Sequence, residues 1–379
     1  MPLVLNEEQQ MLKDAARGFL SEKAPVAALR KLRDSNDPDG FDRGLWKEMA
    51  EMGWAGILID EEFGGSEFGY VGAGVIAEEM GRTLTASPFQ STALLAATAL
   101  QKFADDKQKQ ATLPAIATGE RLLAFAVDEG NKHHPDRVAL AAEKSGNGFK
   151  LNGEKSFVAD GHVADQLIVA ARTGGAAGEK EGLSLFLVDA DRAGIDIERT
   201  SMVDSRNAAR IRFENVDVTG DDLIGDADRA YMAIEGVLSA GRAGLAAEMS
   251  GAAQAAFEMT TDYLKQRTQF GTTIGTFQAL QHRAAHLYSE LELAKSVVLK
   301  SLQELDANFG MAGLICSLAK AKVGEAAKLS ALEAIQMHGG IGMTDEYDIG
   351  FYLKRIRVAQ EMFGDSAYHA DRIATMRGY

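Results

Sequence analysis

The sequence predicts an α+β fold with three parts: an N-terminal helical domain, a middle antiparallel β-barrel or sandwich, and a C-terminal bundle of four long helices. Three observations predict it. Apolar residues recur at helical spacing through the first part of the chain. From Leu122 the segments become short and alternating, divided by Gly and Asn. From about Arg229 they become long and rich in Ala and Leu, as in a helical bundle. These changes place the three domains at residues 1–119, 120–228 and 229–379, and 379 residues exceed one ordinary core.

The N-terminal part opens on a capping-box pattern, Asn6 with Gln9 three residues later. Apolar residues between Leu12 and Leu20 then follow helical spacing. A Gly64-Gly65 pair marks a turn between helices. Further helices are expected at residues 42–52, 71–83, 91–103 and 106–117.

Strand signals fill the middle part. Asn152-Gly153 lies between two alternating segments and predicts a tight hairpin at that point. A second hairpin is expected across the small, flexible segment 173–182, with 183–188 as its return strand. The β domain is expected to end near Ile224.

The last part predicts four helices. Their expected ranges are residues 231–267, 276–307, 310–338 and a terminal segment after Tyr347.

Composition limits the function. A net charge of −15 disfavours a nucleic acid or an anionic membrane as partner. The single Cys316 excludes an intramolecular disulfide and a cysteine-based zinc site, and adjacent His133-His134 indicates surface residues more than a metal site. The N-terminus lacks the pattern of a signal peptide, and the longest apolar run, residues 93–100, is far shorter than a membrane span. We therefore expect a cytoplasmic protein.

Two motifs in the last part carry chemistry. In the first, Tyr263-x3-Arg267-x-Gln269-Phe270-Gly271, a helix leads into an arginine and a turn, an arrangement suited to presenting a guanidinium and a ring to an anionic, planar ligand. The second, about seventy residues on, is Gln336-x2-Gly-Gly-x-Gly. Its glycines suit a backbone that approaches a phosphate, although Gly339 is also the residue expected to cap a helix after His338. Together, in this order and spacing, the motifs resemble those of the acyl-CoA dehydrogenase family.

The resemblance covers essentially the whole chain and implies the activity: FAD-dependent α,β-desaturation of an acyl-CoA thioester. In this family FAD lies between two subunits, held in cis by the middle domain and in trans by the bundle of the neighbour. The resemblance assigns Arg242 to substrate binding and Phe157 to the cis side of FAD. It assigns to the trans side Arg267, Gln269, Phe270, Gln336, Gly339 and Gly340.

The sequence departs from the family in two places. The loop usually written Thr-Glu-Pro-Gly-Ala-Gly-Ser-Asp is replaced by residues 128–136, so the cis half is altered. Phe363 occupies the position of the family's catalytic glutamate, and Gly241 occupies the alternative position before Arg242. Desaturation needs a carboxylate within reach of the α-proton. Asp365 is a weak candidate for that base, and Glu361 a weaker one.

An intact trans half, an altered cis half and a missing base favour one hypothesis. The chain then resembles the small, partner subunit of heteromeric acyl-CoA dehydrogenases such as pimeloyl-CoA dehydrogenase, and would complete the FAD site of a second subunit in a heterotetramer. Substrates of that group include fatty acyl and steroid side-chain thioesters. Two alternatives stay open: a self-sufficient homo-oligomer with a displaced acid as base, and a non-enzymatic CoA-thioester-binding protein on the same fold.

Overall fold

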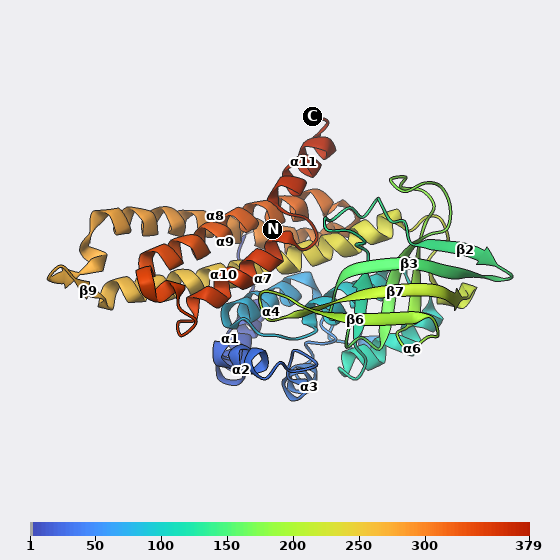
Figure 1. The fold of residues 1–379 in the computed structure, drawn as a ribbon, viewed down its shortest axis with the longest axis horizontal. Helices are drawn as coiled ribbons and strands as arrows, with labels where there is room; N and C mark the ends of the chain where they lie inside the picture. Colours follow the sequence, from blue (N-terminus) through green and yellow to red (C-terminus); the bar gives the residue numbers. More distant parts are fainter. Residues whose placement is uncertain (1–2) are drawn as a thin grey trace. The chain divides into compact units, whose positions relative to one another are not determined.

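A computed structural model describes residues 3–379. The chain forms two compact units, each described separately below. The first contains the described residues up to Lys31, Tyr70–Thr85 and Arg242–Tyr379; the second contains Leu32–Gly69 and Ala86–Gly241. Along the chain, helices are followed by a β region and then by long helices (Figure 1), which confirms the predicted order of elements.

Long helices dominate the first unit, and α9 packs against α8, α10 and α11. The expected last helix of the bundle is instead two short helices, because Phe363 and Gly364 have φ values of +57° and +102° and cannot continue a right-handed helix. The helices of this unit are α1 (Glu7–Lys23), α4 (Gly69–Thr83), α7 (Tyr231–Gln266) from Arg242 onward, α8 (Gln278–Asn308), α9 (Gly313–His338), α10 (Ile349–Glu361) and α11 (Ser366–Arg377).

The predicted start of α1 is confirmed. Asn6 Oδ1 accepts a hydrogen bond from the Gln9 amide at 2.8 Å, and Gln9 Oε1 accepts one from the Asn6 amide at 3.0 Å. This reciprocal cap satisfies two backbone donors that the first turn of a helix leaves open. The helix α2 (Val26–Asp34) follows it.

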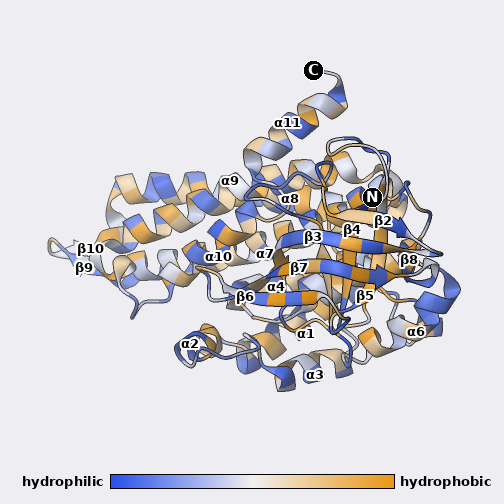
Figure 2. Cartoon of the chain, turned by 45° about the vertical axis from the view of Figure 1, so that its right-hand side comes forward, coloured by the Kyte–Doolittle hydropathy of each residue, from blue (hydrophilic) through white to orange (hydrophobic). Residues whose placement is uncertain are grey.

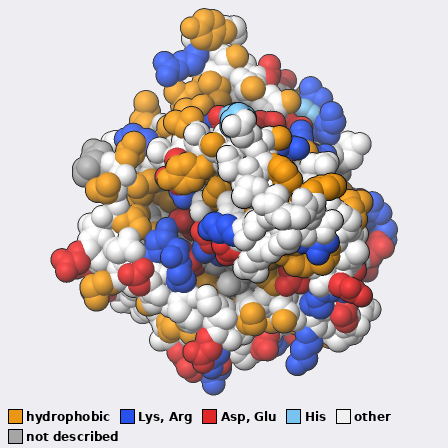
Figure 3. Space-filling view, turned by 90° about the vertical axis from the view of Figure 1, so that its left-hand side faces the viewer, with side chains coloured by type: hydrophobic (Ala, Val, Ile, Leu, Met, Phe, Trp, Pro, Cys, Tyr) orange, Lys and Arg blue, Asp and Glu red, His pale blue; other side chains and the backbone are white. Residues whose placement is uncertain are grey.

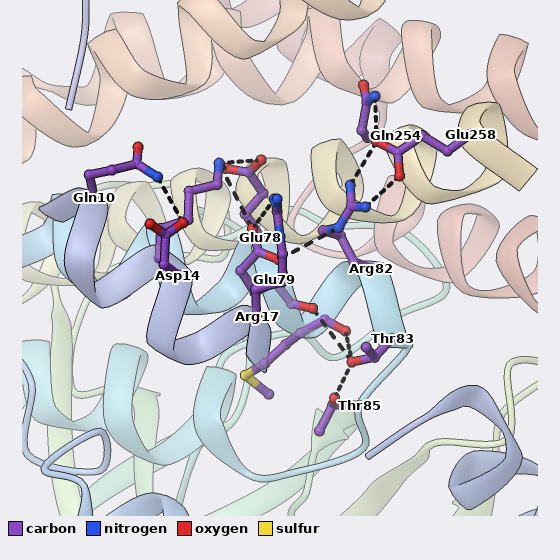
Figure 4. A network of polar contacts seen from close by, with 12 residues as sticks. Gln10, Asp14, Arg17, Glu78, Glu79, Arg82, Thr83, Thr85, Gln254 and Glu258 are labelled. Carbon is purple, nitrogen blue, oxygen red and sulfur yellow. Dashed lines mark hydrogen bonds and ion pairs between the residues drawn. The ribbon is translucent and has the colours of Figure 1, made fainter. Parts of the chain in front are cut away.

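A charged network ties α1, α4 and α7 together within the first unit (Figure 4). Glu79 is buried, and its carboxylate accepts two hydrogen bonds from Arg17, at 2.9 and 3.0 Å. Arg82, one turn further along α4, donates to Glu258 of α7. A buried carboxylate needs such partners, since leaving it unpaired would cost several kcal/mol, on the order of 3–5.

The second unit is built on an eight-stranded sheet with the order β6-β7-β3-β2-β4-β5-β8, and β1 pairs with β4. The strands are β1 (Leu123–Ala126), β2 (Ala141–Ser145), β3 (Gly148–Ala159), β4 (Gln166–Arg172), β5 (Leu183–Asp189), β6 (Ile195–Ser201), β7 (Asn207–Val218) and β8 (Leu223–Ile224). Figure 2 shows hydrophobic residues concentrated on β4 and β5, whose core includes Val169 and Phe186. The sheet is antiparallel except that β4 pairs in parallel with β1 and, through Ala141 and Arg172, with β2.

Helices complete the second unit. The sequence predicts a regular helix over residues 91–103. In the structure the first part of this range belongs to a π-helix, which has a wider turn than an α-helix, and the regular helix α5 begins only at Ala97. The helices are α3 (Arg43–Glu51), η1 (Glu61–Phe63), η2 (Phe89–Ala96, the π-helix), α5 (Ala97–Phe103) and α6 (Asp106–Ala117).

The hairpin predicted at Asn152-Gly153 is wrong, because both residues lie inside β3. The actual hairpin joins β2 to β3 across Gly146 and Asn147, with Ser145 paired to Gly148. Gly153 has φ +143°, a positive value that side chains rarely adopt but one that differs from the left-handed helical values of a tight type I′ turn. It lies at a β-bulge, where a Cβ would come within 2.9 Å of the Leu140 backbone. The glycine therefore serves close packing of the chain. The β4–β5 hairpin was predicted correctly.

Along residues 3–379, no helix combines the length and the apolar character that crossing a bilayer requires.

Candidate functional site

The first motif forms a small hairpin that closes α7 toward α8. Strands β9 (Thr268–Gln269) and β10 (Thr272–Thr273) pair antiparallel, and Phe270 and Gly271 occupy the turn with φ values of +54° and +76°. Two successive residues with positive φ are typical of a type I′ turn. A phenylalanine in this region is strained, and its side chain is 91% exposed. Strain combined with an exposed ring favours a ligand-binding role over a packing role.

Arg267 precedes this turn and is held by its backbone alone. Its amide donates to Tyr263 O at 2.8 Å, and its carbonyl accepts from the Ile274 amide at 2.9 Å. Its side chain is exposed and makes no hydrogen bond or ion pair with any residue in the described part of the chain. A fixed backbone and an open guanidinium suit a phosphate or carboxylate ligand.

The second motif contacts the first. The His338 ring stacks on the Tyr263 ring, one helical turn before Arg267, with centroids 4.5 Å apart. His338 Nε2 lies 3.2 Å from the Tyr347 hydroxyl, and Nδ1 lies 2.7 Å from Ala334 O. Burial lowers the pKa of His338, while the Ala334 carbonyl opposes that shift. The His338 ring, which contacts the rings of Tyr263 and Tyr347, therefore links the two motifs. The sequence analysis did not predict this link.

Gly339 begins the short helix η6 (Gly339–Met343), and its amide caps α9 by donating to the carbonyls of Gln336 and Ile335. Its φ of +64° is one that glycine adopts without strain. A Cβ on Gly340 would meet no heavy atom within 4 Å, so the space beside this backbone is open. The cap and an open approach for a ligand are thus compatible.

Gln336 lines a groove of about 640 Å³ formed by α9, η6 and α10. Thr344 and Tyr347 contribute polar groups to it. Its charged lining residues are Arg283 and Lys354, and the acids Glu333 and Asp345, of which Glu333 pairs with Arg283 at 2.5 Å. Its volume and mixed lining are those of a small-molecule site. Figure 3 looks at the end of the molecule that carries the β9–β10 hairpin, and hydrophobic side chains lie open on that face between charged ones.

A second turn, between α10 and α11, contains the position of the expected catalytic acid. Phe363 is buried there, 6% exposed. Arg242 Nε donates to the Phe363 carbonyl at 3.4 Å, and His369 Nε2 lies 3.1 Å from the same oxygen. Lys320 Nζ, fully buried, donates to Gln360 O and Gly364 O at 2.9 Å each. Burial, reinforced by the charge of Arg242, lowers the pKa of Lys320 to about 7.

The two nearby acids are engaged elsewhere. Asp365 caps α11, accepting from the Tyr368 amide at 2.7 Å. Glu361 pairs with Arg357 at 2.8 Å on an exposed helix face. Lys320 and His369 hold the turn, and neither was predicted from the sequence: the acceptors of Lys320 lie 40 and 44 residues away, and that of His369 is a backbone carbonyl.

The alternative position for the catalytic base, directly before Arg242, is also not an acid but Gly241. The Gly241 carbonyl accepts from Gln90 Nε2 at 3.0 Å, and both residues belong to the second unit. Gln90 comes from the π-helix η2. The unusual backbone of that segment thus positions an amide against α7.

Phe157, expected on the cis side of FAD, lies at a bulge of β3 with φ +52° and is 53% exposed. As at Phe270, a strained backbone presents an exposed ring. Asp160, three residues on, accepts from Ser91 Oγ at 2.6 Å and is buried.

Residues 128–136, which replace the cis motif of the family, include a contact within the loop itself, between His133 and Asp128. His133 was expected at the surface, but it is buried, with Nδ1 2.8 Å from Asp128. Only His134 is exposed. No group of three or more His, Cys, Asp or Glu side chains within residues 3–379 is arranged to hold a metal ion.

Comparison with known proteins agrees with this architecture. Three family models match: the acyl-CoA dehydrogenase N-terminal domain at residues 6–120, the middle domain at 128–216 and the C-terminal domain at 230–376. A probable acyl-CoA dehydrogenase of Bacillus subtilis, YngJ, is 31% identical, with 100% of this chain and 99% of the relative covered.

Solved structures give the same result. The acyl-CoA dehydrogenase from Geobacillus kaustophilus is 28% identical with a TM-score of 0.91, covering 99% of each chain. A variant of the steroid ACAD Tcur3481-Tcur3483 is also 28% identical, with a TM-score of 0.88 and 98% of each chain covered. The chain belongs to the acyl-CoA dehydrogenase family of FAD-dependent oxidoreductases.

Proposed function

We propose that this chain is the partner subunit of a heteromeric acyl-CoA dehydrogenase, which completes the FAD site of a second polypeptide that carries the catalytic base. The observation that carries this proposal is the buried turn at Phe363. Its backbone is held by Arg242, Lys320 and His369, yet no acid occupies the position. Gly241 leaves the alternative position without an acid as well.

The residues of the first unit fit the adenine-nucleotide half of FAD. The open guanidinium of Arg267 suits the pyrophosphate. Phe270 and Gln269 would pack and hydrogen-bond beside it. Gln336 with the Gly339-Gly340 backbone would face the adenosine, since a groove of about 640 Å³ adjoins Gln336. When bound, FAD supplies the acceptor for the substrate β-hydride.

The α-proton needs a different acceptor, a carboxylate within hydrogen-bond reach. Asp365 caps α11 and Glu361 pairs with Arg357, so we assign neither of these acids to that role. The carboxylate therefore comes from the second subunit, and this chain binds and orients FAD. The paired name of the steroid ACAD Tcur3481-Tcur3483, 28% identical, is in keeping with a two-component assembly.

Co-expression with a candidate catalytic subunit tests the proposal. Size-exclusion chromatography should yield a complex that retains FAD in stoichiometric amount by its visible absorbance. Arg267→Gln should lower FAD affinity about 10- to 100-fold, because a charged hydrogen-bond pair contributes about 1.5–3 kcal/mol.

Lys265→Gln is the matched control. Lys265 is exposed, two residues before Arg267, and pairs with Asp262 at 3.5 Å, so its loss should leave FAD retention unchanged. The proposal fails if the two chains do not associate, if association adds no FAD, or if the two variants retain FAD equally.

A further inference from the structure

The His338 ring packs between two other aromatic rings of the first unit. Its centroid lies 4.5 Å from that of Tyr263 and 4.8 Å from that of Tyr347, and the planes of the His338 and Tyr263 rings are 29° apart. His338 is 3% exposed. Aromatic rings at such separations attract one another beyond the effect of their burial. The three rings therefore form a packed aromatic cluster.

Hydrogen bonds at both nitrogens fix the orientation of the His338 ring. Nδ1 lies 2.7 Å from Ala334 O, and because a carbonyl oxygen can only accept, Nδ1 carries the hydrogen of this bond. Nε2 lies 3.2 Å from the Tyr347 hydroxyl, which donates to it when the ring is neutral. These bonds determine the face that the ring presents to Tyr263.

The segment that carries Tyr347 is held independently of α7. Arg30 donates to Asp348 at 2.7 Å and to Asp345 at 3.1 Å. Its guanidinium also lies 4.7 Å from the centroid of the Phe351 ring. One side of the aromatic cluster is therefore anchored to Arg30, which belongs to the same unit.

The other side of the cluster reaches Arg267 through the backbone. Tyr263 O accepts from the Arg267 amide at 2.8 Å, so the position of Tyr263 determines where the last turn of α7 ends. His338 is also followed directly by Gly339, whose amide caps α9. A single buried ring thus contacts the turn of α7 that leads to Arg267 and precedes the glycines of the second motif.

We propose that His338 is a positioning residue for FAD, whose ring sets the spacing between Arg267 and the Gly339-Gly340 backbone. A ligand that contacts two segments binds more weakly when their spacing varies, because binding must then order them. His338 acts through Arg267 and not through a contact of its own with the cofactor. The inference rests on the contacts with FAD proposed above, but not on the pairing with a second polypeptide.

FAD affinity of His338→Gln is the first test. The substitution removes the ring, and the affinity should fall about tenfold, a coupling typical of residues in contact. Flavin fluorescence titration measures it on the complex with a catalytic subunit, or on the chain alone if no complex forms. A failed subunit pairing therefore does not decide this test, whereas an unchanged FAD affinity in His338→Gln overturns the proposal.

The double variant His338→Gln/Arg267→Gln separates positioning from general destabilisation. It should bind FAD no more than about twofold more weakly than Arg267→Gln alone, because the contact that His338 positions is already absent. Losses that add in the double variant would show that His338 acts independently of Arg267, which contradicts the proposal.

Hydrogen exchange of the chain without FAD is an independent measurement. The amides of residues 264–274 should exchange at least about fivefold faster in His338→Gln, because the end of α7 and the β9–β10 hairpin lose their support. His369→Gln is the matched control: it makes the same substitution at another buried histidine of this unit, which contacts Phe363 O. Equal acceleration in both variants overturns the proposal.

Tyr347→Phe is a milder variant that keeps the ring and removes only the hydroxyl bonded to His338. FAD affinity should fall about threefold, because one neutral hydrogen bond is lost from the cluster. The matched control is Tyr352→Phe, which removes a hydroxyl that donates to Arg82 O at 2.7 Å in the same unit and should leave FAD affinity unchanged. Equal losses in these two variants, or no loss in either, also overturn the proposal.

Discussion

Two turns of this molecule each contain a Phe-Gly pair in which both residues have positive φ, but the two turns differ in their exposure and in their contacts. Phe270-Gly271 has φ values of +54° and +76°, and Phe363-Gly364 has +57° and +102°. Phe270 is 91% exposed, whereas Phe363 is buried. The first turn leaves its ring and the neighbouring Arg267 open to solvent. The second is fixed by Arg242, Lys320 and His369.

The comparison shows that the same backbone conformation can expose a phenylalanine ring to solvent or bury it, depending on the residues around the turn. A strained turn persists only where something compensates its cost. At Phe363 the compensation is inside the chain, in burial and hydrogen bonds. At Phe270 the described chain offers the backbone pairing of β9 with β10 and the Phe277 ring, at 6.2 Å between centroids, but no burial. The ring of Phe270 therefore stays open to a ligand, as the proposed function requires.

Removing each ring should give the largest contrast. Phe363→Ala should destabilise the protein by about 3–5 kcal/mol, since it empties a buried aromatic site. Phe270→Ala should change the free energy of unfolding by less than about 0.5 kcal/mol, because its ring is in solvent. Urea unfolding of both variants measures this. Similar losses of stability in the two variants would contradict the conclusion that only the Phe363 ring contributes to the packing of the chain.

Lys320→Met should be next in size. It leaves the buried carbonyls of Gln360 and Gly364 without their donor, at a cost of about 2–4 kcal/mol. Lys322→Met is the control, because Lys322 lies on the same helix in a partly exposed pair with Glu290. Thermal unfolding compares them, and a control loss as large as that of Lys320→Met would contradict a specific role for Lys320.

The glycines of the two turns allow a finer test. A Cβ at Gly364 would lie 2.3 Å from Tyr368 Cδ1, so Gly364→Ala should cost about 2–3 kcal/mol in clash and strain. A Cβ at Gly271 would meet nothing within 4 Å, so Gly271→Ala should cost only the left-handed conformation, about 1 kcal/mol. Denaturant midpoints that rank these variants in the opposite order would refute the packing described for the second turn.

A pH dependence of stability is expected at the second turn, smaller than the loss caused by removing the Lys320 side chain. The pKa of Lys320 is lowered from its ordinary value to about 7 in the folded chain. Between these two values the unfolded chain binds more protons, so the contribution of Lys320 to stability rises with pH above 7. The rise between pH 7 and 8.5 should be on the order of 1–2 kcal/mol, and Lys320→Met should lack it. Identical pH profiles of the two proteins would show that Lys320 keeps its ordinary pKa.

The sequence predicted elements well where local pattern decides them. The helix expected at 231–267 is α7, Tyr231–Gln266, because an Ala-rich stretch without proline has few alternatives. Asn152-Gly153 misled the reading, because packing against Leu140 required a glycine in a strand. The π-helix η2 gave no pattern that distinguishes it from an α-helix.

For the candidate site, the sequence motifs predicted which residues are exposed for binding, but not which residues support the turns that carry them. Arg267 and Phe270 were singled out, and the structure displays both at the surface. Lys320 could not be predicted, because its acceptors lie 40 and 44 residues away and a lysine in an Ala-rich helix is ordinarily exposed. The contact between Tyr263 and His338 depends likewise on tertiary packing.

The most direct test of the central claim is anaerobic visible spectroscopy of the chain with FAD and an acyl-CoA, first alone and then with its catalytic partner. The account predicts that the chain alone leaves the flavin bands unchanged, because it supplies no base, and that the complex bleaches them. Bleaching by the chain alone would contradict the account and mean that an acid of this polypeptide removes the α-proton.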